Sequence, residues 1–125
     1  MSYHHTAILT ANLATSQSFY EALGLVVLRR WEKPAQRLSV VALRHPDGFI
    51  LELIHHPDHQ YLSLPLLPEL FHIGFAVADI QLVLNRLPDI QLIKPITPGV
   101  SVKEFAFIRD PSGLPVELVV EKEGQ

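Results

Sequence analysis

Two histidine–glutamate pairs occur at nearly equal separations in this sequence. His5 precedes Glu52, and His72 precedes Glu117 by almost the same number of residues. Imidazole nitrogens and carboxylate oxygens together suit borderline divalent ions such as Ni, Zn, Mn, Fe or Co, and they disfavour soft Cu(I). Four such ligands on a six-coordinate ion leave room for a substrate with two adjacent oxygens. The pattern therefore predicts a site for one divalent metal ion.

The two pairs belong to an internal repeat. The segment His45–Leu53 reads His-Pro-Asp-Gly-Phe-Ile-Leu-Glu-Leu, and Asp110–Leu118 reads Asp-Pro-Ser-Gly-Leu-Pro-Val-Glu-Leu. Pro, Gly, Glu and Leu fall at matching offsets, and a strand-like segment with a histidine lies upstream of each copy. Self-similarity at a fixed spacing indicates a duplicated structural unit. The chain is therefore interpreted as a tandem duplication.

The elements that must position these residues form an α+β fold of two tandem β-α-β-β-β modules. Alternating apolar residues predict strands, and helix-type spacing with Gly24 as a stop and Asp79 as an N-cap predicts the two helices. We expect one domain over residues 1–125, with module one at about 1–56, a linker at about 57–70 and module two at about 71–122. The predicted strands are 3–10, 25–31, 38–44, 49–54, 71–77, 90–96, 102–108 and 114–120, and the predicted helices are 15–23 and 80–87.

Strand alternation predicts which face carries the four residues. Residues two apart share a face of a strand, so His72 lies with the small residues Gly74 and Ala76, and His5 lies with Ala7. His4 falls on the opposite face. Glu52 and Glu117 each interrupt an otherwise apolar strand, where a carboxylate is costly unless it is paired or bound to a metal. We therefore expect a positive charge between the two copies.

Composition excludes several classes of protein. The 125 residues are 48% hydrophobic, carry a formal net charge of −3 and contain no cysteine. Lys and Arg are scattered, which argues against nucleic-acid binding. The first residues show no signal peptide, and the apolar segment around residues 62–71 is interrupted by prolines, so we expect neither secretion nor membrane insertion. A cytoplasmic location follows as an expectation.

Several motifs together resemble the vicinal oxygen chelate superfamily, the fold of glyoxalases, bleomycin resistance proteins and extradiol dioxygenases. They are the opening His-Thr-Ala-Ile-Leu, the later Ser-Phe-Tyr-Glu-Ala-Leu-Gly-Leu, the Leu-Glu-Leu strand, Phe-His-Ile-Gly-Phe-Ala-Val, and the closing Phe-Ile-Arg-Asp-Pro-Ser-Gly-Leu-Pro-Val-Glu-Leu. Within that superfamily the chain is most similar to glyoxalase I. The resemblance covers nearly the whole chain.

The resemblance implies a fold, a ligand set and a reaction. It implies curved mixed sheets around a metal cleft, with His5, Glu52, His72 and Glu117 as metal ligands. It also implies a lyase or isomerase that acts through a metal-chelated enediolate on a small 2-oxoaldehyde adduct. Glu117 is then the catalytic base, with Glu52 as its partner. Pairing of modules within or between chains implies a homodimer.

Departures from glyoxalase I keep other functions open. Similar bacterial enzymes have an arginine where this chain has Leu9 and an asparagine where it has His56, and both contact glutathione there. The identity of the thiol is therefore open. Another metal–enolate enzyme such as an epimerase, or a non-catalytic small-molecule-binding protein of the antibiotic-resistance type, remains an alternative. Phe107 in place of a tyrosine argues against a ring-cleaving dioxygenase, and Glu52 argues against thiol transferases with three protein ligands.

Other polar residues have simpler interpretations. A single histidine in a strand is usually structural, and only the duplication favours a metal role for these two. The cluster at residues 55–59 is interpreted as a solvated linker. Arg29 and Arg30 are expected to be solvated charges, and Trp31 is expected to be a core or interface residue.

Overall fold

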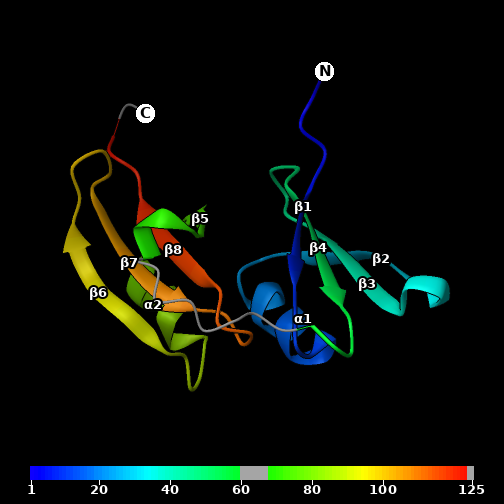
Figure 1. The fold of residues 1–125 in the computed structure, drawn as a ribbon. Helices are drawn as coiled ribbons and strands as arrows, with labels where there is room; N and C mark the ends of the chain where they lie inside the picture. The colour runs from blue at the N-terminus through cyan, green and yellow to red at the C-terminus, as the bar shows by residue number, and fades with distance from the viewer. Residues whose placement is uncertain (60–67, 124–125) are drawn as a thin grey trace. The chain divides into compact units, whose positions relative to one another are not determined.

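The computed structural model describes residues 1–59 and 68–123 (Figure 1). It contains two compact units, Met1–Leu62 and Ser63–Gln125, and each is described by itself. Most of the predicted linker, residues 60–67, lies outside the described residues. None of the helices in the described part of the chain has the length and apolar character needed to cross a bilayer.

The first unit is a four-stranded mixed sheet with one α-helix. Its strands lie in the order β1-β4-β3-β2, with β1 parallel to β4 and the other neighbours antiparallel. A short 3-10 helix joins β2 to β3. The elements are β1 (Thr6–Leu9), α1 (Leu13–Ala22), β2 (Val26–Lys33), η1 (Pro34–Gln36), β3 (Leu38–Arg44) and β4 (Ile50–His55).

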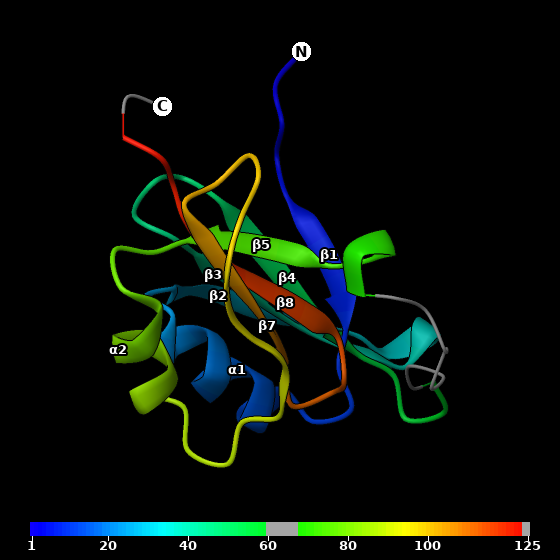
Figure 2. The same cartoon turned by 90° about the vertical axis from the view of Figure 1, so that its left-hand side faces the viewer.

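The second unit repeats the same topology. Its strands lie in the order β5-β8-β7-β6, with β5 parallel to β8 and the others antiparallel (Figure 2). The elements are η2 (Pro68–Leu70), β5 (Ile73–Ala76), α2 (Ile80–Asn85), β6 (Leu92–Pro98), β7 (Glu104–Arg109) and β8 (Pro115–Val120). The predicted α+β class with two β-α-β-β-β modules and mixed sheets is confirmed.

Each sheet buries one face against its helix. In the first unit, Leu51 and Leu53 of β4 are fully buried, and so is Tyr20 of α1. In the second unit, Val116 and Leu118 of β8 are fully buried. Successive residues of a strand point to opposite faces, so Glu52 and Glu117, which lie between these pairs, point to the face away from the helix. Burial of the apolar neighbours therefore fixes the direction of both carboxylates.

The duplicated turn before each carboxylate-bearing strand has the same backbone hydrogen bonds in both units. Gly48 donates its N–H to the carbonyl of His45, and Gly113 donates its N–H to that of Asp110. Both glycines have positive φ, 101° and 96°, which L side chains adopt at a cost. The same turns set the registers of β4 and β8, so they also determine which residues oppose Glu52 and Glu117.

Several boundaries differ from the sequence prediction. The strands β1 and β5 are shorter than expected at both ends, so His5 and His72 lie immediately before their strands and not within them. Their ladders begin at the pairs Thr6–Leu51 and Ile73–Val116, where the partner strands themselves have just begun. His55, expected in the linker, completes β4, and its Nδ1 lies 3.0 Å from the carbonyl oxygen of Thr10.

Replacement of the turn glycine tests the duplicated turn. A Cβ at position 113 would meet no atom within 4 Å, so Gly113→Ala should cost backbone energy alone. We expect a loss of about 1–2 kcal/mol in the free energy of unfolding, measured by urea denaturation. Gly74→Ala is the matched control. It adds a methyl group to an ordinary strand position and should be neutral or slightly stabilising. An equal loss for both variants would contradict the role of positive φ.

Candidate metal centre

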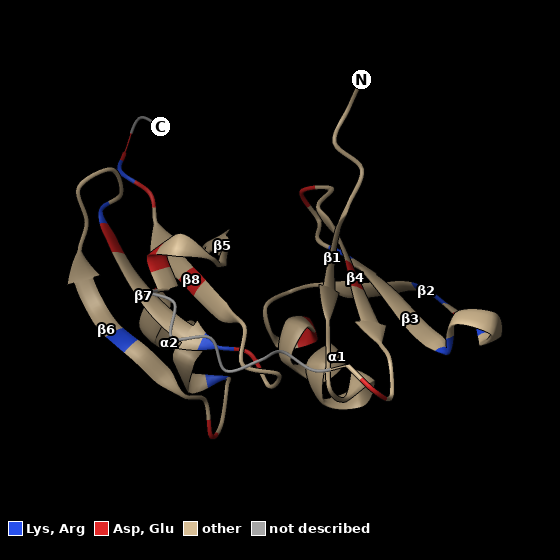
Figure 3. Ribbon diagram, in the orientation of Figure 1, with Lys and Arg blue, Asp and Glu red and all other residues tan. Residues whose placement is uncertain are grey.

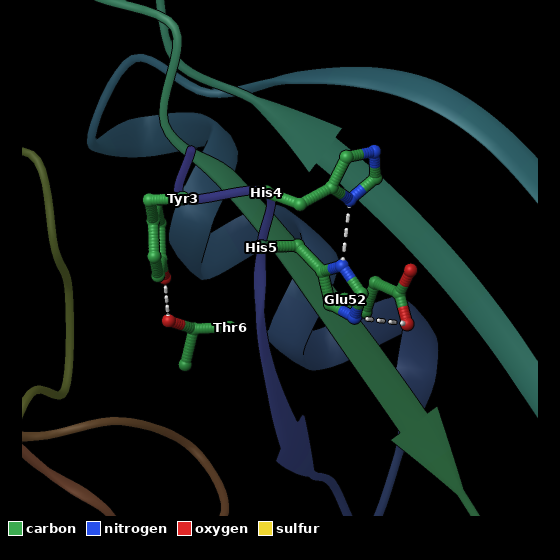
Figure 4. Close-up of polar contacts among 5 residues, drawn as sticks. All are labelled: Tyr3, His4, His5, Thr6 and Glu52. Carbon is green, nitrogen blue, oxygen red and sulfur yellow. Dashed lines mark hydrogen bonds and ion pairs between the residues drawn. The ribbon is translucent and has the colours of Figure 1, made fainter. Parts of the chain in front are cut away.

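The first unit brings His5 and Glu52 together on the face of the sheet away from α1. Nε2 of His5 lies 3.6 Å from Oε1 of Glu52 (Figure 4). The Glu52 side chain is 14% exposed and that of His5 is 38% exposed. Glu52 lies on β4 between Ala42 of β3 and Ala7 of β1, which are its register partners. Both register partners of Glu52 are therefore small residues.

The second unit brings His72 and Glu117 together in the same way. Nε2 of His72 lies 3.4 Å from Oε1 of Glu117, and the two side chains are 25% and 24% exposed. Glu117 lies on β8 between Phe107 of β7 and Gly74 of β5. The ring of Phe107 contacts the His72 ring edge to face, with centroids 5.0 Å apart. The aromatic contact and the carboxylate together orient the imidazole.

A backbone carbonyl selects the tautomer of His72. Nδ1 of His72 lies 2.7 Å from the carbonyl oxygen of Pro68. A carbonyl oxygen only accepts hydrogen bonds, so Nδ1 carries the proton and donates it. In the neutral ring, Nε2 then carries no proton, and its lone pair faces the Glu117 carboxylate. Two acceptors in contact repel each other unless a cation, either a proton or a metal ion, lies between them.

The corresponding contact of His5 is made by a side chain. Nδ1 of His4 lies 2.8 Å from Nδ1 of His5, so one ring donates to the other (Figure 4). If His5 is the donor, its Nε2 is free to face Glu52, as in the second unit. Nearby, the hydroxyls of Tyr3 and Thr6 share a hydrogen bond in the same segment. The tautomer of His5 therefore depends on His4, although strand alternation predicts that His4 lies on the opposite face.

The geometry of each pair fits two ligands of one ion. Ligand atoms about 2.1 Å from an ion lie about 3.0 Å apart at an octahedral angle and about 3.4 Å apart at a tetrahedral angle. The observed separations of 3.6 Å and 3.4 Å are close to these values. The second nitrogen of each ring is hydrogen-bonded, as is usual for histidine ligands. Imidazole nitrogen with carboxylate oxygen is a donor set that zinc and similar divalent ions accept.

Each unit on its own brings together two candidate ligands. Within the described residues of either unit, no group of three His, Asp or Glu side chains is arranged to hold a metal ion. The histidines of the 55–59 segment do not join the pairs: His55 contacts Thr10, and the rings of His56 and His59 contact each other. The sequence repeat predicts all four residues of the two pairs, whereas the contacts of the Pro68 carbonyl and of His4 follow from neither residue type nor spacing.

A match to a protein-family model shows how this chain is related to known proteins. The profile described as Glyoxalase/Bleomycin resistance protein/Dioxygenase superfamily matches residues 2–118. The chain belongs to this superfamily. The match spans both units, so the recognition of the family from sequence motifs is confirmed.

Individual relatives within the superfamily are distant. The chain is 28% identical over 121 residues to the uncharacterized protein YwkD of Bacillus subtilis, with 94% of each chain covered. It is 30% identical over 144 residues to lactoylglutathione lyase of Pseudomonas aeruginosa, covering 94% of this chain and 81% of that protein. Among solved structures, the trypanothione-dependent glyoxalase I of Leishmania major has a TM-score of 0.78 at 28% identity, covering 97% of this chain and 87% of the other. The superfamily thus includes enzymes of the glyoxalase I type similar to this chain.

The tautomer of His72 gives a direct test of the carbonyl contact. In metal-free protein, two-bond ¹H–¹⁵N NMR spectra at a pH where the ring is neutral should show Nδ1 protonated and Nε2 bare. His56 is the matched contrast, because its Nδ1 accepts a hydrogen bond from the N–H of Asp58 at 3.0 Å and should carry no proton. The same tautomer at both rings would show that the Pro68 carbonyl does not select the proton position.

Proposed function

We propose that His5, Glu52, His72 and Glu117 bind one divalent metal ion, and that the chain is a metal-dependent lyase or isomerase of the glyoxalase I type. The substrate in this proposal is a small 2-oxoaldehyde adduct. The observation that carries the proposal is the repeated contact between a histidine Nε2 and a glutamate Oε1, at 3.6 Å and 3.4 Å, one in each unit. Membership of a superfamily that includes glyoxalase I enzymes supports it.

One ion that takes both pairs would have four protein ligands. Metal sites in proteins are usually built from at least three side chains, so a single pair is too few. The two pairs are equivalent by duplication, which makes a shared ion the simplest arrangement of all four residues. The units of one chain, or of two chains in a homodimer, would supply them. Ni, Zn, Mn, Fe and Co all suit this donor set.

When bound, the ion supplies Lewis-acid stabilisation of negative charge that develops on substrate oxygens. The protein then has to move a proton on the carbon next to the carbonyl group. Glu117 is better placed than Glu52 for this step because its side chain is 24% exposed against 14%. Its neighbour Gly74 lacks the Cβ that would lie 3.6 Å from Oε1, whereas Ala7 fills the equivalent place beside Glu52. Glu117 is therefore assigned as the base and Glu52 as its partner.

The thiol part of the substrate is assigned only by class. Leu9 and His56 stand where similar enzymes carry residues that contact glutathione, so another thiol is an equal candidate. An epimerase that removes a proton beside a carbonyl would use the same four residues and the same base. A non-catalytic binding protein would need neither the metal nor Glu117. Metal analysis of the purified protein, followed by turnover of hemithioacetals made from several thiols, separates these functions.

Glu117→Gln should separate metal binding from proton transfer. The amide keeps an oxygen ligand but cannot accept the proton, so most of the metal should remain while kcat falls by about 10²–10⁴-fold. Metal content is measured by mass spectrometry and kcat by the hemithioacetal assay. Glu121→Gln, at an exposed position after β8, is the control and should keep full activity. Full activity of Glu117→Gln would show that another group is the base.

His72→Ala should weaken metal binding itself. It removes the imidazole whose Nε2 faces Glu117 and leaves the ion with one ligand fewer. We expect the dissociation constant for Zn²⁺ or Ni²⁺ to rise by at least about tenfold, as for the loss of a ligand-supporting contact. His59→Ala removes an exposed histidine of the other unit and should bind the metal as the wild type does. Equal affinity of both variants and the wild type would exclude His72 as a ligand.

A further inference from the structure

The edge strand of the first unit contains an irregularity next to the candidate site. Val27 of β2 pairs with Leu43 of β3, but the next pair is Arg29 with Ala42, so Leu28 is an extra residue in the ladder. In an unbroken ladder Leu28 would oppose Ala42 and Arg29 would point to the face covered by α1. A β-bulge re-aims the side chains that follow it. Here it places Arg29 on the face that carries Glu52.

The register puts Arg29 and Glu52 in one row across the sheet. Arg29 opposes Ala42, and Ala42 opposes Glu52. Two strand spacings separate the backbones of Arg29 and Glu52, which is about 10 Å. The next residue, Arg30, confirms the alternation, because its guanidinium donates a hydrogen bond to the side chain of Gln17 on α1. Both arginines are exposed, as expected, and each also contacts a neighbouring side chain.

Trp31 supports the guanidinium of Arg29. The Arg29 Cζ atom lies 5.4 Å from the centroid of the Trp31 ring, and Trp31 shares the face of Arg29. A guanidinium held over an aromatic ring interacts through its flat face, while the N–H groups in its plane stay available as donors. Within the described part of the chain, no carboxylate forms an ion pair with Arg29. The Arg29 guanidinium, with its planar N–H donors available, fits a carboxylate, which can accept two parallel hydrogen bonds.

The second unit repeats the arrangement independently. Leu92 of β6 pairs with Ile108, and the next pair is Lys94 with Phe107, so Ile93 is an extra residue. Phe107 opposes Glu117, which puts Lys94 in the row of that carboxylate. The ammonium of Lys94 lies 5.1 Å from the ring centroid of Phe105. Figure 3 shows basic residues on the edge strands β2 and β6 and acidic residues on β4 and β8. Both copies thus place a cation over an aromatic ring, two strands from the candidate ligand.

We infer that Arg29, supported by Trp31, binds a carboxylate group of the substrate about 10 Å from its reacting end. This inference rests on the proposed function, which places that reacting end near Glu52. It names a substrate class: a molecule with two adjacent oxygens at one end and a carboxylate at the other. Arg29 contacts the remote group only, so it sets substrate specificity and takes no part in proton transfer.

The inference can be tested by comparing how tightly the protein binds two hydroxamates, a measurement that needs no turnover. The hydroxamate group offers two adjacent oxygens to a metal ion. Suberic acid monohydroxamate carries a carboxylate at the far end of an eight-carbon chain, which extends to about 10 Å. Octanohydroxamate has the same chain with an uncharged end. Isothermal titration calorimetry on Zn²⁺-loaded protein gives the ratio of the two dissociation constants.

The wild type should prefer the carboxylate-tailed probe about tenfold, the size expected of one charge-assisted contact. Arg29→Ala should remove this preference and leave the affinity for octanohydroxamate unchanged. Arg30→Ala removes the same charge from the neighbouring position and should keep the preference. Trp31→Leu should reduce the preference without abolishing it. Circular dichroism of each variant checks that the sheet is intact.

Four results would overturn the inference. Equal loss of preference in Arg29→Ala and Arg30→Ala would assign the effect to net charge alone. If Lys94→Ala loses the preference for the carboxylate-tailed probe while Arg29→Ala keeps it in full, the carboxylate binds in the second unit and not at Arg29. If His72→Ala does not weaken the binding of either hydroxamate, the proposed metal site is wrong. The inference, which rests on that site, is then wrong as well. Metal-dependent binding of both probes with no tail preference in the wild type would leave the proposed function standing and refute only the role of Arg29.

Discussion

The close approach of an imidazole lone pair to a carboxylate is the contact on which the rest of this structure depends. In the second unit the Pro68 carbonyl holds the proton on the far side of the His72 ring, so Nε2 and Glu117 face each other as acceptors. Such a pair is disfavoured unless a positive charge lies between its members. Buried leucine and valine neighbours hold the glutamate on its face of the sheet. The apolar packing therefore positions the carboxylate, and a proton or a metal ion between the two acceptors would stabilise the pair.

Much of the fold follows from residue patterns. The repeat of Pro, Gly, Glu and Leu identified the two units, and Asp79 caps α2 as predicted, accepting a hydrogen bond from the N–H of Leu82. The prediction that Glu52 and Glu117 each interrupt an otherwise apolar strand is confirmed, because they lie in β4 and β8 between fully buried neighbours. These features are local in sequence, so a single chain without relatives was enough to predict them.

The features that escaped prediction depend on contacts between segments or on one residue of register. The bulge at Leu28 changes the face of every residue after it, and no residue type in β2 marks the bulge. Alternation counted from the start of that strand would place Arg29 beside α1. The Pro68 carbonyl reaches His72 from an adjoining 3-10 helix, and a backbone contact leaves no trace in side-chain composition. The two units have also diverged, since His4 makes in one unit the contact that a carbonyl makes in the other.

The extra residues of β2 and β6 also affect how this protein meets other chains. In the described part of the chain both strands are the last of their sheets, and the outward N–H and C=O groups of such a strand attract further strands and favour aggregation. A kinked edge with a protruding cation is a poor template for such growth. Deletion of Leu28 would leave Arg29 opposite Ala42 yet straighten the edge, so the protein would keep its side-chain arrangement while losing protection against fibril-like association.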